Sequence, residues 1–153
     1  MSKVLRKRRA IREKAIQTLF QLINPPEHLS QDDAIAFALE AGNYPDEGYD
    51  KVEGDYLYHL INGVQENQEE IDQKIQSYLK DWTLESIAKI DLVVLRLAFY
   101  EFFYVDNQVV PQAVAVDEGI EMAKAFSNDQ SRQFVSGVLL KLLNDNKESE
   151  TSD

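Results

Sequence analysis

Residues 90–104, IDLVVLRLAFYEFFY, decide the fold, because this stretch is apolar on nearly every side. Its only charged residues beyond the first turn are Arg96 and Glu101. A helix that is apolar all round has to be covered by other elements on all of its faces. The stretch therefore predicts a central helix around which the rest of the chain packs.

On both sides of this stretch, apolar side chains recur every three to four residues, which is the period of a helix with one buried face. Ser30 and Asp33 form a capping signal before one such helix, and Pro111 suits the first turn of another. With residues 90–104, the sequence predicts an all-α fold of about seven helices, with a loop at residues 42–48. The first of the other predicted helices has its first turns in the basic stretch at residues 3–14, carries apolar residues from 11 to 23 and ends at Asn24. The rest cover residues 34–41, 56–64, 71–79, 111–126 and 131–143.

The length of 153 residues suits one domain with one substantial core, and we expect this domain to span residues 1–143. The last ten residues, NDNKESETSD at 144–153, are all polar, and we expect a disordered tail there. Gly119 and Gly137 lie inside predicted helices, where each glycine costs about 1 kcal/mol relative to alanine. We expect a close helix–helix approach at both glycines.

Composition excludes several classes of protein. The chain has no cysteine, which excludes disulfides, thiolate metal sites and a cysteine nucleophile. Its two histidines, His28 and His59, do not have the spacing of metal ligands, and no glycine-rich nucleotide loop is present. We therefore predict that the protein is not an enzyme and needs no metal or other cofactor.

Hydropathy predicts no membrane association. No apolar run reaches the roughly 20 residues that a membrane-spanning helix needs. Polar residues interrupt the N-terminal stretch AIQTLFQLI, and no signal-peptide cleavage site follows it. We expect a cytoplasmic protein.

Positive charge is concentrated at the N-terminus. The segment KVLRKRRAIREK, residues 3–14, holds seven basic residues and one acidic residue, whereas the whole chain carries a net charge of −11. Arg8 and Arg12 are four residues apart on a helix, where like charges repel, and a polyanion would relieve that repulsion. Arginine and lysine bind RNA phosphates, and the acidic remainder would confine RNA to this end. Alternatively, the segment is a solvated arm, or it binds an acidic protein. Binding to a membrane surface fits the segment less well, because its basic residues lie at one end of the helix and not along a polar face.

Four stretches of the chain, taken in order, resemble the family of the transcription antitermination factor NusB. They are RRAIREKAIQTLFQL at residues 8–22, LINGVQENQEEIDQKI at 60–75, LRLAFYE at 95–101 and VPQAVAVDEGIEMAKAFSNDQSRQFVSGVLLKL at 110–142. The resemblance implies an all-helical fold of seven helices in two small subdomains. Ser136 and Leu140 depart from the family pattern, and the acidic segment 25–55 has no clear match in it.

The resemblance also implies a function. Members of this family bind the boxA element of nascent RNA together with the small-subunit ribosomal protein also called NusE. The pair joins an RNA polymerase complex that suppresses termination, notably in ribosomal RNA operons. A related helical domain is fused to RNA cytosine methyltransferases, but such an enzyme needs a further α/β domain and a catalytic cysteine, so only a fragment would fit that alternative.

The resemblance further implies two sets of site residues. Phe20 and Phe134 are each open to two interpretations, stacking on a base or packing in the core. Arg96 and Glu101 are either part of the NusE-binding surface or an internal ion pair. The residues expected to bind RNA are Arg6, Lys7, Arg8, Arg9, Arg12, Phe20, Gln130, Arg132 and Phe134. The residues expected to bind NusE are Asp91, Arg96 and Glu101.

Overall fold

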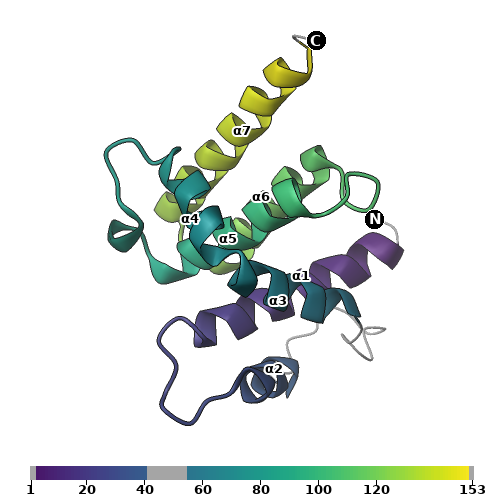
Figure 1. The fold of residues 1–153 in the computed structure, drawn as a ribbon, viewed down its shortest axis with the longest axis vertical. Coiled ribbons are helices and arrows are strands. Elements are labelled where there is room, and N and C mark those ends of the chain that lie inside the picture. Colours follow the sequence, from purple (N-terminus) through teal and green to yellow (C-terminus); the bar gives the residue numbers. More distant parts are fainter. Residues whose placement is uncertain (1–2, 41–54, 152–153) are drawn as a thin grey trace. The chain divides into compact units, whose positions relative to one another are not determined.

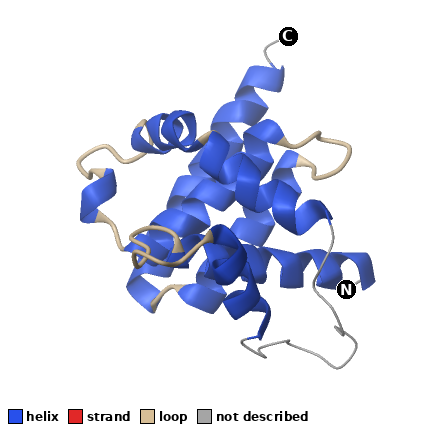
Figure 2. Cartoon of the chain, turned by 60° about the horizontal axis from the view of Figure 1, so that its bottom comes forward, coloured by secondary structure: helices blue, strands red, loops and turns tan. Residues whose placement is uncertain are grey.

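The structure, a computed structural model, describes the backbone of residues 3–40 and 55–151 and the side chains of residues 7–40 and 55–147. Within these residues the regular elements are seven α-helices and one short 3-10 helix, with no strand (Figure 2). The predicted all-α fold of seven helices is confirmed. The predicted loop at 42–48 lies outside the described residues.

The chain divides into two compact units, residues 1–65 and 66–153. In the part of the chain that the structure describes, none of the helices combines the length and the apolar character needed to cross a membrane.

The first unit is built from α1 (Lys3–Gln21), α2 (Gln31–Glu40) and most of α3 (Asp55–Glu66), and α1 packs on α2. The predicted cap of α2 is confirmed. The Asp33 amide donates a hydrogen bond to Ser30 Oγ at 3.0 Å, and the Ser30 amide donates to Asp33 Oδ2 at 3.3 Å. These two bonds satisfy backbone donors that the start of a helix otherwise leaves open.

The second unit is built from α4 (Gln68–Gln76), α5 (Lys89–Tyr104), α6 (Gln112–Phe126) and α7 (Asp129–Thr151), shown from teal to yellow in Figure 1. Helix α5 contacts α4, α6 and α7. Every residue from Asp91 to Phe102 except Arg96 is buried. The prediction that this stretch forms the central helix is confirmed, and the reason is that three neighbours cover its apolar faces.

The two helical glycines differ in their surroundings. A Cβ atom built on Gly119 would lie 2.8 Å from Leu139 Cδ1 and 2.9 Å from Ala98 Cβ, so α5, α6 and α7 meet closely there. The predicted close approach is confirmed at Gly119. At Gly137 it is wrong, because a Cβ atom there would have nothing within 4 Å and the residue is exposed.

The end of the last helix also differs from the expectation. The sequence predicted a helix that ends near Leu143 and a disordered tail from residue 144. Helix α7 instead continues to Thr151, and the Asn146 side chain donates a hydrogen bond to the Leu142 carbonyl at 2.8 Å. Extending a formed helix adds one backbone hydrogen bond for each residue ordered, so polar residues without a core to cover can still prolong it.

An ion pair joins α4 to α5. Arg96 Nε and Nη2 each donate to the Asp72 carboxylate at 2.8 Å, and the two side chains are 12% and 19% exposed. The alternative in which Arg96 pairs with Glu101 is therefore wrong. The cause lies in the packing, which brings Asp72 of the neighbouring helix in front of the guanidinium.

Replacing Asp72 with asparagine is expected to lower the free energy of unfolding by about 1–2 kcal/mol. The variant loses the partly buried, bidentate ion pair with Arg96. Urea denaturation would measure this change. Glu121→Gln on α6 is the matched control. Its pair with Lys124, at 3.2 Å, is more exposed, and such pairs contribute about 0.5 kcal/mol or less. Equal destabilisation of the two variants would contradict the assignment.

Candidate nucleic-acid interface

The basic stretch of α1 is divided by burial. Lys7 is exposed, and Arg8 and Arg9 are half-buried. Arg12 and Lys14 are each only 1% exposed. The side chain of Arg6 lies outside the described side chains, although its backbone belongs to α1.

The buried cations are part of the interior of the protein. Lys14 Nζ donates a hydrogen bond to Gln17 Oε1 at 3.2 Å. Burial lowers the pKa of Lys14, and the charge of Glu13 partly opposes this shift. Burial likewise raises the pKa of Glu13, against the charges of Lys14 and Arg9. The sequence predicted Arg12 as an RNA contact, but its burial leaves Lys7, Arg8 and Arg9 as the accessible cations of this stretch among the described side chains.

Phe20 is 45% exposed near the end of α1. The alternative that it packs in the core is therefore wrong for this structure. Its exposed ring is available for contact, and the prediction that it stacks on a base stays a prediction.

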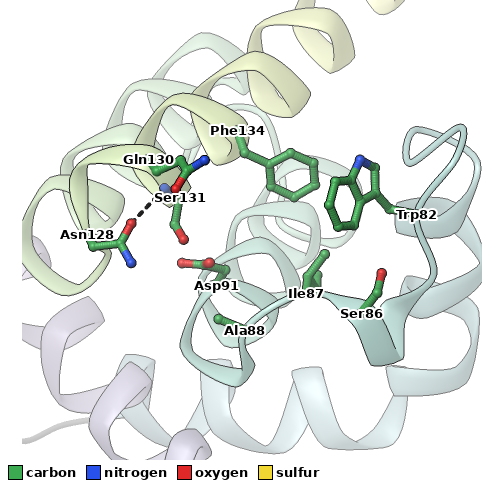
Figure 3. Close-up of a pocket in the computed structure, with 9 residues that line it drawn as sticks. All are labelled: Trp82, Ser86, Ile87, Ala88, Asp91, Asn128, Gln130, Ser131 and Phe134. Atoms are coloured by element: carbon green, nitrogen blue, oxygen red, sulfur yellow. Dashed lines mark hydrogen bonds between the residues drawn. The ribbon is translucent and has the colours of Figure 1, made fainter.

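A pocket of about 350 Å³ lies in the second unit, between the chain that leads into α5 and the start of α7 (Figure 3). Figure 3 shows the rings of Trp82 and Phe134 side by side along one part of it, with polar side chains along the other. The ring centroids of Trp82 and Phe134 are 6.4 Å apart. The lining residues are Trp82, Ser86, Ile87, Ala88, Asp91, Asn128, Gln130, Ser131 and Phe134.

The connection after α4 positions Trp82. Lys80 has a φ of 46°, in the left-handed region that residues other than glycine rarely adopt. This conformation turns the chain away from α4. The Gln76 side chain then donates a hydrogen bond to the Trp82 carbonyl at 2.8 Å. Next, Thr83 and Ser86 hold a single turn of 3-10 helix, because the Thr83 amide donates to Ser86 Oγ at 3.0 Å. Trp82 is therefore 54% exposed on an anchored backbone.

The opposite part of the pocket is held by the junction of α6 and α7. Ser127 Oγ donates a short hydrogen bond to Asp91 Oδ1, which ties this junction to the first turn of α5. Asn128 Oδ1 accepts a hydrogen bond from the Ser131 amide at 2.9 Å and caps α7 (Figure 3). The cap sets the direction of the first turns of α7, and these turns carry Gln130 and Phe134.

The chemistry of this pocket suits a nucleobase better than a phosphate. Its lining contains two aromatic rings and the side chains of Asn128, Gln130 and Ser131, which donate and accept hydrogen bonds. Asp91 is the only ionisable lining residue, and none of the lining residues is basic. A flat, uncharged base can stack and form hydrogen bonds in such a site, whereas a phosphate would meet a carboxylate.

The structure places two of the three predicted residues of the last helix in the pocket. Gln130 is exposed and Phe134 is half-buried, so the ring of Phe134 is neither fully core nor fully free. Arg132 does not line the pocket. Its guanidinium pairs with Asp129 at 3.4 Å and donates to the Lys124 carbonyl at 3.4 Å.

The residues predicted to bind NusE are largely internal. Asp91 is 2% exposed and Glu101 is 1% exposed. Arg96 is held by Asp72, as described above. Asp91 also lies in the same pocket as Gln130 and Phe134, the residues predicted to bind RNA. Direct contact of these three side chains with a protein partner stays a prediction.

Sequence reasoning missed Trp82, Ser86 and Asn128 as pocket residues. Trp82 had one detectable signal, because the chain's single tryptophan stands in a turn, outside the apolar period of the neighbouring helices. Asn128 had the signal of a helix cap. Neither signal indicates that the two residues face the same pocket.

Comparison with known proteins gives consistent matches over most of the chain. The sequence pattern of the NusB family matches residues 9–144. The transcription antitermination protein NusB of Lactiplantibacillus plantarum is 48% identical over 138 residues, which cover 89% of this chain and 94% of that protein.

Two solved structures are also similar. NusB of T. maritima has a TM-score of 0.70 at 32% identity and covers 88% of both chains. A structure of the antitermination factors NusB and NusE in complex with dsRNA has a TM-score of 0.71, covering 92% of this chain and 98% of that one. At 19% identity, this second match shows a shared fold.

Proposed function

This chain belongs to the NusB family, and we propose that it is an RNA-binding transcription antitermination factor. In this role it binds the boxA element of nascent RNA together with NusE, as part of an RNA polymerase antitermination complex in ribosomal RNA operons. The family match spans both compact units, and we infer that they form one domain. The protein acts as an adaptor without catalysis, in the cytoplasm, where nascent bacterial RNA is made.

The pocket between Trp82 and Phe134 is the observation that carries this proposal. Sequence-specific proteins recognise RNA mainly in single strands, whose bases can stack on aromatic side chains and form hydrogen bonds along their edges. The pocket offers both kinds of contact within about 350 Å³. We assign it to one base of the RNA, with Gln130 and Asn128 at the base edge.

The accessible cations of α1 supply the second part of the interaction. We assign Lys7, Arg8 and Arg9 to phosphates of the RNA, because they are the accessible cations of this stretch among the described side chains. Phosphate contacts add affinity that does not depend on sequence. The net charge of −11 repels RNA from most of the remaining surface. Base contacts in the pocket then favour boxA over other RNA, and NusE adds further surface.

The proposal is tested by fluorescence anisotropy with labelled boxA RNA and a scrambled RNA of equal length, with and without NusE. We expect tighter binding to boxA than to the scramble and a further gain with NusE. Changing Arg8 and Arg9 together to alanine is expected to weaken binding about tenfold at roughly 0.15 M salt. It should also reduce the salt slope by about 0.7 for each phosphate that the variant no longer binds.

Lys141→Ala is the matched control, because Lys141 is an exposed cation on α7 outside both proposed contact surfaces. It should leave the preference for boxA unchanged. Equal binding of both RNAs, with no effect of NusE, would overturn the proposal and favour a basic arm that binds an acidic protein.

A further inference from the structure

Three side chains of the first unit form a stack at the start of α3. The Arg8 guanidinium lies over the ring of Tyr56, with its central carbon 5.6 Å from the ring centroid. The rings of Tyr56 and His59 are stacked, with centroids 6.0 Å apart and planes 23° apart. Tyr56 and His59 are three residues apart on α3, a spacing that places both on one face of the helix.

Exposure increases along this stack. Arg8 and Tyr56 are half-buried, whereas His59 is exposed. The arginine is held over an aromatic face by a cation–π contact, which limits the orientations that its guanidinium adopts. The stack therefore combines a positioned cation with an exposed flat ring, and Tyr56 contacts both.

This combination of groups suits single-stranded RNA. Its phosphates bind cations, and its bases stack on aromatic rings, including imidazole. Each nucleotide carries a phosphate and a base on the same sugar. Because Arg8 lies over Tyr56 and Tyr56 stacks on His59, the stack can engage a nucleotide through both its backbone and its base.

We propose that Arg8, Tyr56 and His59 form a second RNA-binding site, in which one base stacks on His59 while Arg8 contacts the adjoining phosphate. Tyr56 is a positioning residue that holds the other two. The inference rests on the proposed function, since it assumes an RNA ligand. It adds base contacts to a basic surface that sequence reasoning assigned to arginine and lysine alone.

The test compares His59→Ala and His59→Phe on boxA RNA, with abasic nucleotides substituted one position at a time. We expect His59→Ala to weaken binding about fivefold or more, as for the removal of one stacked base. His59→Phe should retain affinity, because the phenyl ring stacks without carrying charge. The salt slope should be the same in both variants, since each keeps the cations that bind phosphate.

One abasic position should remove the difference between wild type and His59→Ala, because the base that stacks there is then missing. His28→Ala is the matched control, as the chain's other histidine is also exposed and lies between α1 and α2. It should bind boxA as wild type does. Thermal melting followed by circular dichroism would verify that each variant is folded.

Two results would overturn the inference alone. In the first, wild type prefers boxA but His59→Ala binds every RNA as well as wild type does. In the second, the weaker binding of His59→Ala persists at every abasic position, which would indicate an indirect effect. If wild type itself shows no preference for boxA, the proposed function fails, and the inference fails with it.

Discussion

Phe134→Ala is expected to weaken binding of single-stranded boxA RNA by about 5- to 150-fold, which corresponds to the roughly 1–3 kcal/mol of one stacked base. The phenyl ring of Phe134 lines the pocket from α7, with its centroid 6.4 Å from that of Trp82. Alanine would remove the stacking face and leave the polar side chains of the pocket in place. Fluorescence anisotropy at fixed salt would measure the change in Kd.

Two further variants separate stacking from other causes. Phe37→Ala removes a ring from α2 that is 58% exposed, more than Phe134, and should leave the Kd unchanged. Phe134→Leu keeps an apolar side chain without the aromatic face, and it should bind almost as weakly as Phe134→Ala. Wild-type affinity in Phe134→Leu would show that the position contributes through packing, and the base-binding pocket would then be rejected.

The second large effect concerns stability. Gly119→Ala is expected to lower the free energy of unfolding by about 1–3 kcal/mol, as an added methyl group does in a tightly packed core. The new Cβ would lie 2.8 Å from Leu139 Cδ1, which is the end of a side chain and can move. It would also lie 2.9 Å from Ala98 Cβ, which is attached directly to the backbone of α5 and moves only with that helix. Urea denaturation would measure the decrease.

Gly137→Ala is the matched substitution, and we expect it to change the free energy of unfolding in the opposite direction. Nothing lies within 4 Å of the added Cβ, so the change should raise the free energy of unfolding by up to about 1 kcal/mol through helix propensity. A double variant, Gly119→Ala with Ala98→Gly, should lose less free energy of unfolding than the two single variants lose together, because it removes the close contact with Ala98 Cβ. Destabilisation by Gly137→Ala, or strict additivity in the double variant, would contradict this account.

Local sequence patterns determined the helices and the order in which they occur. The all-round apolar stretch at 90–104 became the central helix α5, and Ser30 and Asp33 formed the predicted cap of α2. Such features depend on residues within one or two helical turns of each other, so they can be predicted from the chain alone. The end of α7 was predicted less well, because polar residues fit both a helix and a tail.

Only the tertiary structure decided which side chains are accessible and which meet. It buried Arg12 and Lys14 within a basic stretch that looked uniform in sequence. It paired Arg96 with Asp72, 24 residues earlier, and joined Ser127 to Asp91 across 36 residues. The same packing assembled the pocket from two distant segments and gave the two helical glycines opposite surroundings. Periodicity specifies the apolar face of each helix, but the residues that this face meets depend on how the helices pack, which is a property of the whole fold.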